Sequence, residues 1–150
     1  MSRCVALLLA IVPVPLAFAD DHRAQINYTL HCRGCHLAGA EGLAGEVPRL
    51  RNFAGFFLHS REGREFVIRV PGVATASLSD EELAELMNWL LLTFSREQLP
   101  QTFTPFSSAE VAALRSNLVP DPGTARTRIL NDIAGNLPAL AGELRQHTSD

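Results

Sequence analysis

The sequence predicts an all-α protein. Residues 22–33 carry Ala24, Tyr28 and Cys32 at every fourth position, which places them on one face of a helix. Residues 79–94 carry a broader apolar stripe at helical spacing. No stretch shows a convincing strand pattern. A content of 47% hydrophobic and 19% charged residues is ordinary for a globular chain. We therefore expect a small helical domain followed by a helical extension.

The first predicted helix, residues 22–33, ends in a distinctive motif. Cys32 and Cys35 are two residues apart, and His36 follows the second cysteine directly. Two thiols about one helical turn apart suit covalent haem attachment, in which they add to the haem vinyl groups as thioethers. The histidine after the second cysteine is then the proximal iron ligand. The motif predicts one haem c held by Cys32, Cys35 and His36.

Two other uses of a CxxC pair fit the sequence less well. A thioredoxin-like redox pair is expected in a βαβ pattern, and half of a zinc site needs a second cysteine or histidine pair at ligand spacing. Neither pattern is found around Cys32 and Cys35. Haem attachment is therefore the preferred interpretation.

The N-terminus predicts export. A basic start at Arg3 precedes an apolar run over residues 5–18, and the small-x-small sequence 17–19 is typical of a cleavage site. The run is shorter than the roughly 20 residues of a spanning helix and contains two prolines. We expect a signal peptide over residues 1–19 that leaves with Cys4, and a soluble, periplasmic or otherwise exported product without a membrane span.

The charge of the mature chain excludes one class of partner. All basic residues are arginines, and removal of Arg3 leaves 12 of them against 16 acidic residues, a net charge of −4. A net negative chain is a poor ligand for nucleic acid. The arginines gather in residues 49–70 and the acidic residues in 80–98, which suggests either a clamp for haem propionates or a docking patch for an acidic partner, or simply a solvated surface.

The middle of the chain is expected to be irregular. Residues 37–58 are rich in glycine and end in an apolar patch of phenylalanines, which suits a loop wrapped over a flat apolar ring. Residues 62–70 fit a short helix or an extended segment equally well. Pro71-Gly72 predicts a turn.

The strongest single helix is predicted over residues 79–94. Ser79 and Glu82 form a capping box, and three acidic residues occupy the first turn, where the helix dipole favours them. The apolar stripe that follows needs a partner, and the first helix is the natural one. We expect Trp89 or its neighbours to cross near Tyr28.

Residues 21–95 resemble the class I c-type cytochromes. The resemblance rests on Tyr28 four residues before Cys32, the CxxCH motif, the glycine-rich loop and the final helix opened by Leu78-Ser79-Asp80-Glu81-Glu82. It implies that the first and last helices cross beside the haem and that His36 is the proximal ligand. It also implies a methionine as distal ligand, on the loop before the last helix.

The sequence departs from that family at the distal position. Val70-Pro71 stands where a Met-Pro pair is expected, and valine cannot bind iron. Met87 is the only mature methionine, and its place on the apolar stripe favours packing over ligation. His59, in a polar turn, is another possible distal ligand, because imidazole binds haem iron well. The sequence predicts no methionine ligation of the usual kind, with His59 bound or the site open.

Residues 96–150 lie beyond the resemblance. Ser107 and Glu110 predict a helix to about Leu118, residues 124–133 predict another, and the end is expected to be a loose helix or tail. The predicted division is a signal peptide over 1–19, a cytochrome domain over 20–95 and a helical extension over 96–150, packed on the core or partly loose.

Two function classes follow. The first is an exported monohaem electron carrier, with redox protein partners such as an exported dehydrogenase or another cytochrome. The second is a haem enzyme or a gas- or peroxide-binding protein with an open distal site. The chain offers no obvious distal acid-base pair, so electron transfer is preferred and no catalytic residue is assigned.

Overall fold

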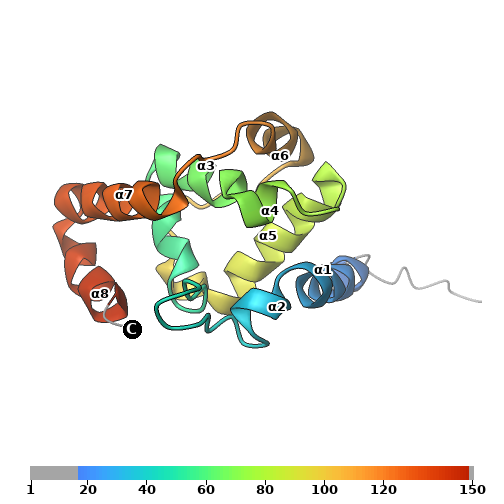
Figure 1. Ribbon diagram of the computed structural model, residues 1–150, viewed down its shortest axis with the longest axis horizontal. Coiled ribbons are helices and arrows are strands. Elements are labelled where there is room, and N and C mark those ends of the chain that lie inside the picture. The colour runs from blue at the N-terminus through green and yellow to red at the C-terminus, as the bar shows by residue number, and fades with distance from the viewer. Residues whose placement is uncertain (1–16, 149–150) are drawn as a thin grey trace, which may run out of the picture.

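The computed structural model describes residues 17–148, with side chains described over 21–145, and this part of the chain consists of helices joined by loops (Figure 1). The only pairing of extended backbone in it is one isolated bridge, between Leu43 and Val47. The helices are α1 Ala17–His31, α2 Arg33–His36, the 3₁₀ helix η1 Ala54–His59, α3 Arg61–Arg69, α4 Pro71–Ala74, α5 Asp80–Phe94, the 3₁₀ helix η2 Arg96–Gln98, α6 Ser108–Arg115, α7 Pro122–Asn136 and α8 Pro138–Thr148. The predicted all-α class is confirmed.

Helix α5 is the central element, and its sequence explains its start and its burial. The Ser79 hydroxyl accepts from Glu82 N (3.2 Å) and the Glu82 carboxylate accepts from Ser79 N (2.9 Å), which completes the predicted capping box. Seven residues of the helix are buried: Leu83, Ala84, Leu86, Met87, Leu90, Leu91 and Phe94. Such a helix needs neighbours on several sides, and α1, α6 and η1 supply them.

The first helix packs along α5, as the sequence predicts. Its bounds differ from the predicted 22–33, because the described helix begins at Ala17 and Cys32 separates it from α2. The predicted cleavage point after Ala19 therefore lies in the first turn of α1, and residues 1–16 of the predicted signal peptide lie outside the described residues. Arg23 pairs with Glu85 and joins the two helices at their exposed edge.

The apolar patch predicted in the loop over 37–58 is instead a 3₁₀ helix. Residues 54–58 of η1 are all buried, and the Phe57 ring stacks on Phe66 of α3 with 5.1 Å between centroids. Residues 61–69, undecided from sequence, are helical because Ser60 caps them by accepting from Gly63 N. The turn predicted at Pro71-Gly72 is wrong. Proline at the first position of a helix is favourable, and it opens the short helix α4.

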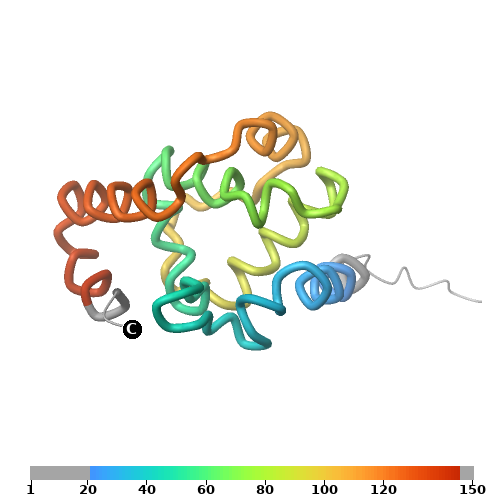
Figure 2. The backbone as a smooth tube through the Cα atoms, in the orientation of Figure 1, coloured from blue at the N-terminus to red at the C-terminus, as the bar shows by residue number. Residues whose placement is uncertain are grey.

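The helices of the C-terminal extension lie around this core, with α6 at the upper right of the view and α7 and α8 at the left (Figure 2). Helix α6 packs on α3 and α5, and α7 packs on α3 and η1. Val111, Ile129 and Ile133 are at most 2% exposed and belong to the same apolar cluster as α5. Helix α6 ends at Arg115, earlier than predicted, and the end of the chain forms helix α8.

Two arginines fasten the extension to the core. Arg64 of α3 forms a two-pronged ion pair with Glu110 (2.7 and 2.8 Å) and lies over the Phe106 ring, 4.0 Å from its centroid. Arg115, at the end of α6, donates to the backbone carbonyls of Ala74, Ala76 and Leu78 at 3.0, 2.6 and 2.8 Å, and to Asp80. The segment before α5 is thus held by a residue of the extension.

Residues of the extension are expected to contribute to stability as core residues do. Ile129→Ala removes a side chain that is 2% exposed, and we expect it to lower the free energy of unfolding by about 2–5 kcal/mol. The matched control is Leu118→Ala, on a residue that is 43% exposed, which should change it by less than about 0.5 kcal/mol. Denaturant unfolding measures both. Equal, small effects would mean that the extension is not part of the folded core.

Candidate haem site

The CxxCH motif lies where α1 gives way to α2. Cys32 N donates to the Tyr28 carbonyl (2.9 Å), and His36 N donates to the Cys32 carbonyl (2.9 Å), so the motif is wound as one continuous turn. Cys32 is half-buried and Cys35 is exposed, and both are free thiols. The structure therefore leaves both sulfurs available for thioether bonds, on one helical turn beside His36.

The ring of His36 is oriented by a backbone carbonyl. Its Nδ1 lies 3.1 Å from the oxygen of Pro48, in the loop that follows the motif. A carbonyl oxygen can only accept, so Nδ1 carries the proton and Nε2 of the neutral ring has a free lone pair. This is the arrangement of a metal-binding histidine, whose second nitrogen is fixed by a hydrogen bond. The sequence alone did not assign this role to Pro48. The presence of a proline in the glycine-rich loop was the only signal for it.

Burial affects the ionisable groups of the motif. It raises the pKa of the Cys32 thiol to about 11, and the neighbouring Cys35 acts in the same direction. It also lowers the pKa of His36, while the hydrogen bond to Pro48 acts in the opposite direction. Each group is thus in its neutral form in the apolar environment of the site.

Tyr28 connects the motif to the helix crossing. Its hydroxyl donates to the carbonyl of Leu37 (2.7 Å), the residue that follows His36. Its ring lies 5.7 Å from Trp89 and 5.3 Å from Phe94, and those two rings are 5.4 Å apart at nearly a right angle. The predicted contact of Trp89 with Tyr28 is confirmed. The three rings form the aromatic cluster on which α1 and α5 cross.

The loop after the motif is held by backbone bonds to a few buried positions. The carbonyl of Ala40, which is fully buried, accepts from both Leu50 N and Arg51 N at 2.9 Å. Gly42 has a φ of +76°, and a Cβ there would lie 2.4 Å from the Val47 carbonyl, so only glycine fits. The loop therefore keeps Pro48 in place beside His36.

The residues considered for the distal side are placed as follows. The Nε2 of His59, at the end of η1, lies 3.0 Å from the carbonyl oxygen of Gln98, to which it donates. Met87 is 6% exposed in the apolar cluster of α5. Val70 lies between α3 and α4, where its backbone is extended. His59 thus has one ring nitrogen engaged, and Met87 fills space in the core.

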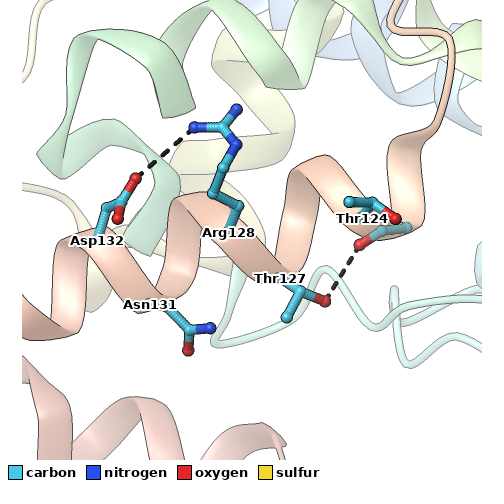
Figure 3. Close-up of a pocket in the computed structure, with 6 residues that line it drawn as sticks. Thr124, Thr127, Arg128, Asn131 and Asp132 are labelled. Atoms are coloured by element: carbon cyan, nitrogen blue, oxygen red, sulfur yellow. Dashed lines mark hydrogen bonds and ion pairs between the residues drawn. The ribbon is translucent and has the colours of Figure 1, made fainter.

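One surface depression lies away from the motif. It is formed along the exposed face of α7, by residues of that helix alone (Figure 3). There the Thr127 hydroxyl donates to the Gly123 carbonyl, and Arg128 pairs with Asp132. The two charged groups of the depression are thus paired with each other. Within the described residues, no group of three or more His, Cys, Asp or Glu side chains is arranged to hold a metal ion.

A helical fold in which two helices cross on an aromatic cluster beside a CxxCH turn defines a small haem protein with covalent attachment. Comparison with known proteins agrees. Two proteins of Thermus thermophilus named cytochrome c-552 are similar to this chain. One is 28% identical over 134 residues, covering 77% of this chain and 88% of that protein. The other is 29% identical over 103 residues, covering 57% and 79%.

These similarities support a c-type cytochrome, an electron carrier of the class that holds haem c covalently. No protein-family model matches the chain, and no solved structure is significantly similar to it. Among the residues that the structure describes, no helix is long and apolar enough to cross a membrane.

The single tyrosine of the chain offers a test of the aromatic cluster. Burial, and then the neighbouring Cys32 and Glu41, raise the pKa of Tyr28 from 10.0 to about 12. A phenol with a raised pKa stabilises the fold fully below about pH 10, and this contribution is lost as the pH rises toward 12. We expect tyrosinate absorbance to appear at a higher pH in folded than in unfolded protein, because the burial that raises this pKa remains when Cys32 is a thioether.

The matched variant is Tyr28→Phe. It should cost about 1 kcal/mol at neutral pH, through the lost hydrogen bond to Leu37, and should remove the stability loss between pH 10 and 12. Denaturant unfolding as a function of pH measures both effects. A phenol that titrates at its ordinary pKa in the folded protein would contradict the buried cluster.

Proposed function

We propose that this c-type cytochrome is an exported monohaem electron carrier, with haem c attached through Cys32 and Cys35 and with His36 as the proximal ligand. The observation that carries the proposal is the hydrogen bond from His36 Nδ1 to Pro48, which directs Nε2 outward as a ligand on the same turn as two free thiols. The residues present fit the cofactor in number, chemistry and spacing.

The chain's own residues prepare this site for electron transfer. Bound haem c supplies an iron that gains or loses one electron. The Pro48 carbonyl fixes the ring plane of His36, and the Tyr28–Leu37 hydrogen bond fixes the end of the CxxCH motif. Neither His36 nor the motif therefore needs to move when the charge of the iron changes. Rigid ligands of this kind keep the cost of reorganisation low, and the apolar cluster around α5 sets the dielectric surroundings.

Export and domain organisation are part of the proposal. We assign residues 1–19 to a signal peptide, 20–95 to the haem domain and 96–150 to the extension. Support comes from the apolar run with its small-x-small end, and from the haem motif itself, since c-type haem is attached outside the cytoplasm. The periplasm is the expected location.

Other redox proteins are the proposed partners, with an exported dehydrogenase or another cytochrome as the main classes. The arginines of segment 49–70 bear on how such a partner would bind. Three of the arginines of segment 49–70 form ion pairs within the chain, Arg61 and Arg69 with Glu65 and Arg64 with Glu110. These three arginines are therefore engaged within the chain and contribute less to the basic docking patch considered from the sequence.

A second function is supported by the distal residues. His59 donates through Nε2 to Gln98, so only its Nδ1 could bind iron, and Met87 is packed in the core. An iron without a sixth protein ligand can bind a diatomic gas or peroxide. The alternative is therefore a haem enzyme or a gas- or peroxide-binding protein with an open distal site.

The haem attachment is tested by the intact mass of the protein purified from an exporting host. We expect the mass of the chain from Asp20 onward plus one haem. Cys35→Ala should retain at most one thioether, and the matched control Cys4→Ser should give the wild-type mass, because Cys4 leaves with the signal peptide. Absence of a haem adduct would reject the proposal, and retention of residues 1–18 in a membrane fraction would mean an anchored cytochrome.

The distal side is tested by absorption spectra of the holoprotein. For an open site we expect high-spin ferric iron and rapid binding of carbon monoxide to the ferrous form, both unchanged in His59→Ala. If His59 is bound, the wild type is low-spin and His59→Ala converts it to high-spin. A sulfur-to-iron charge-transfer band that disappears in Met87→Leu would contradict both and assign the role to Met87.

A further inference from the structure

The segment over 70–79, between α3 and α5, has little apolar packing of its own. Its only helix, α4, is four residues long. Ala74 is its one buried residue, and Val70, Val73 and Leu78 are partly buried against the core. A segment with so little buried apolar surface opens more easily than the helices around it, unless other contacts hold it.

The residues that follow α6 hold the start of this segment. Arg69, the last residue of α3, donates through Nε to the Asn117 carbonyl (2.6 Å). The carbonyl of Arg69 accepts from Val119 N (3.0 Å). The point at which the chain leaves α3 is therefore fixed by the C-terminal extension.

Arg115 of α6 holds the end of the segment. Its guanidinium donates to the carbonyls of Ala74, Ala76 and Leu78 at 3.0, 2.6 and 2.8 Å, and its side chain is only 18% exposed. In the described part of the chain, no backbone N–H donates to the carbonyls of Ala74 and Leu78. Loss of a carbonyl's only partner in a partly buried place costs free energy, so these bonds favour the closed segment.

The end of the segment lies at the opposite end of α5 from the haem motif. Phe94, the last residue of α5, packs on Tyr28 beside the motif, whereas Asp80, the first residue, pairs with Arg115. A helix of 15 residues is about 22 Å long. Figure 1 shows the same arrangement, with α2 near the lower edge, α4 in the upper part and α5 running between them. The segment therefore lies on the side of the haem domain away from His36.

The side chains of the segment cannot fix it to the metal. Residues 70–79 contain no histidine, methionine, cysteine or tyrosine, which are the side chains that bind haem iron. This is also the part of the chain where the resemblance to the class I cytochromes implies a methionine ligand. Since no bond to the iron can keep the segment closed, the hydrogen bonds from the extension are the restraint that the structure provides.

We propose that Arg115 is a positioning residue that keeps residues 70–79 closed over the side of the haem opposite His36, and so limits the access of small ligands to the iron. The inference rests on the proposed haem attachment and goes beyond it, because it gives the extension control over the distal side. Small ligands enter when the segment opens, and opening requires release of the Arg115 guanidinium. The rate of ligand binding to an open iron is then set by this release.

The test is the rate at which carbon monoxide binds to the ferrous holoprotein in wild type, Arg115→Gln and Arg115→Lys. Glutamine cannot donate to three carbonyls at once, so Arg115→Gln should raise the rate about tenfold or more. Lysine keeps the charge but lacks the planar fork, so Arg115→Lys should give a rate between the other two. If Arg115→Gln does not fold, the rate in Arg115→Lys, expected above that of wild type, decides the question.

Three control variants separate the carbonyl contacts from other effects. Asp80→Asn removes only the ion pair with a carboxylate that is 42% exposed, and its rate should stay within about twofold of wild type. Arg128→Gln removes an ion pair of the extension with Glu62, away from the segment, and should match wild type. Ile129→Ala weakens the packing of the extension but leaves Arg115 in place, and should also match wild type.

Two results would overturn the proposal. One is a wild-type rate of carbon monoxide binding in both Arg115 variants. The other is an increase in Ile129→Ala as large as that in Arg115→Gln, because the rate would then follow the general stability of the extension. Failure of the proposed function is recognised separately, as the absence of a haem adduct in the intact mass of every variant.

Discussion

The crossing of α1 and α5 on the Tyr28–Trp89–Phe94 cluster is the contact on which the rest of the structure depends. It fixes the end of α1, and so the turn that carries Cys32, Cys35 and His36. Through the Tyr28 hydroxyl it also fixes Leu37, from which the loop to Pro48 begins. The same three rings thus bury apolar surface and set the geometry of the proposed ligands. An error in their packing would displace the motif as well as weaken the fold.

The C-terminal extension is best understood as part of the same core. Val111 and Ile129 are buried in the cluster that contains α5, and Arg64, Arg115 and Arg126 each join the two parts in a different way. Arginine suits all three positions, because its planar guanidinium can pair with a carboxylate, donate hydrogen bonds to several carbonyls or stack on an aromatic ring. Arginine is the only Lys/Arg-type basic residue of the chain. Composition alone gives no reason for this, but these three arginines have structural roles that depend on the guanidinium group.

The sequence predicted the features that local chemistry determines. The CxxCH turn, the capping box of Ser79 and the contact of Trp89 with Tyr28 each depend on spacing within one helix or on a strong apolar stripe. It did not predict Pro48 as the partner of His36, nor the position of Arg126 beside the loop, because these contacts join residues 12 and more than 70 positions apart. It also misread Pro71-Gly72 as a turn, since a proline that opens a helix and a proline within a turn look alike from sequence. The distal ligand stays a prediction.

The hydrogen bonds from Arg115 to the segment before α5 affect how that segment unfolds locally. Three backbone carbonyls of that segment, and the first residue of α5, share one guanidinium from α6. The segment cannot open on its own without leaving those hydrogen-bond partners unsatisfied, so its local unfolding is coupled to the release of α6. Amide hydrogens there should therefore exchange with solvent together with those of the extension, and access to that side of the haem domain is governed by a helix far along the chain.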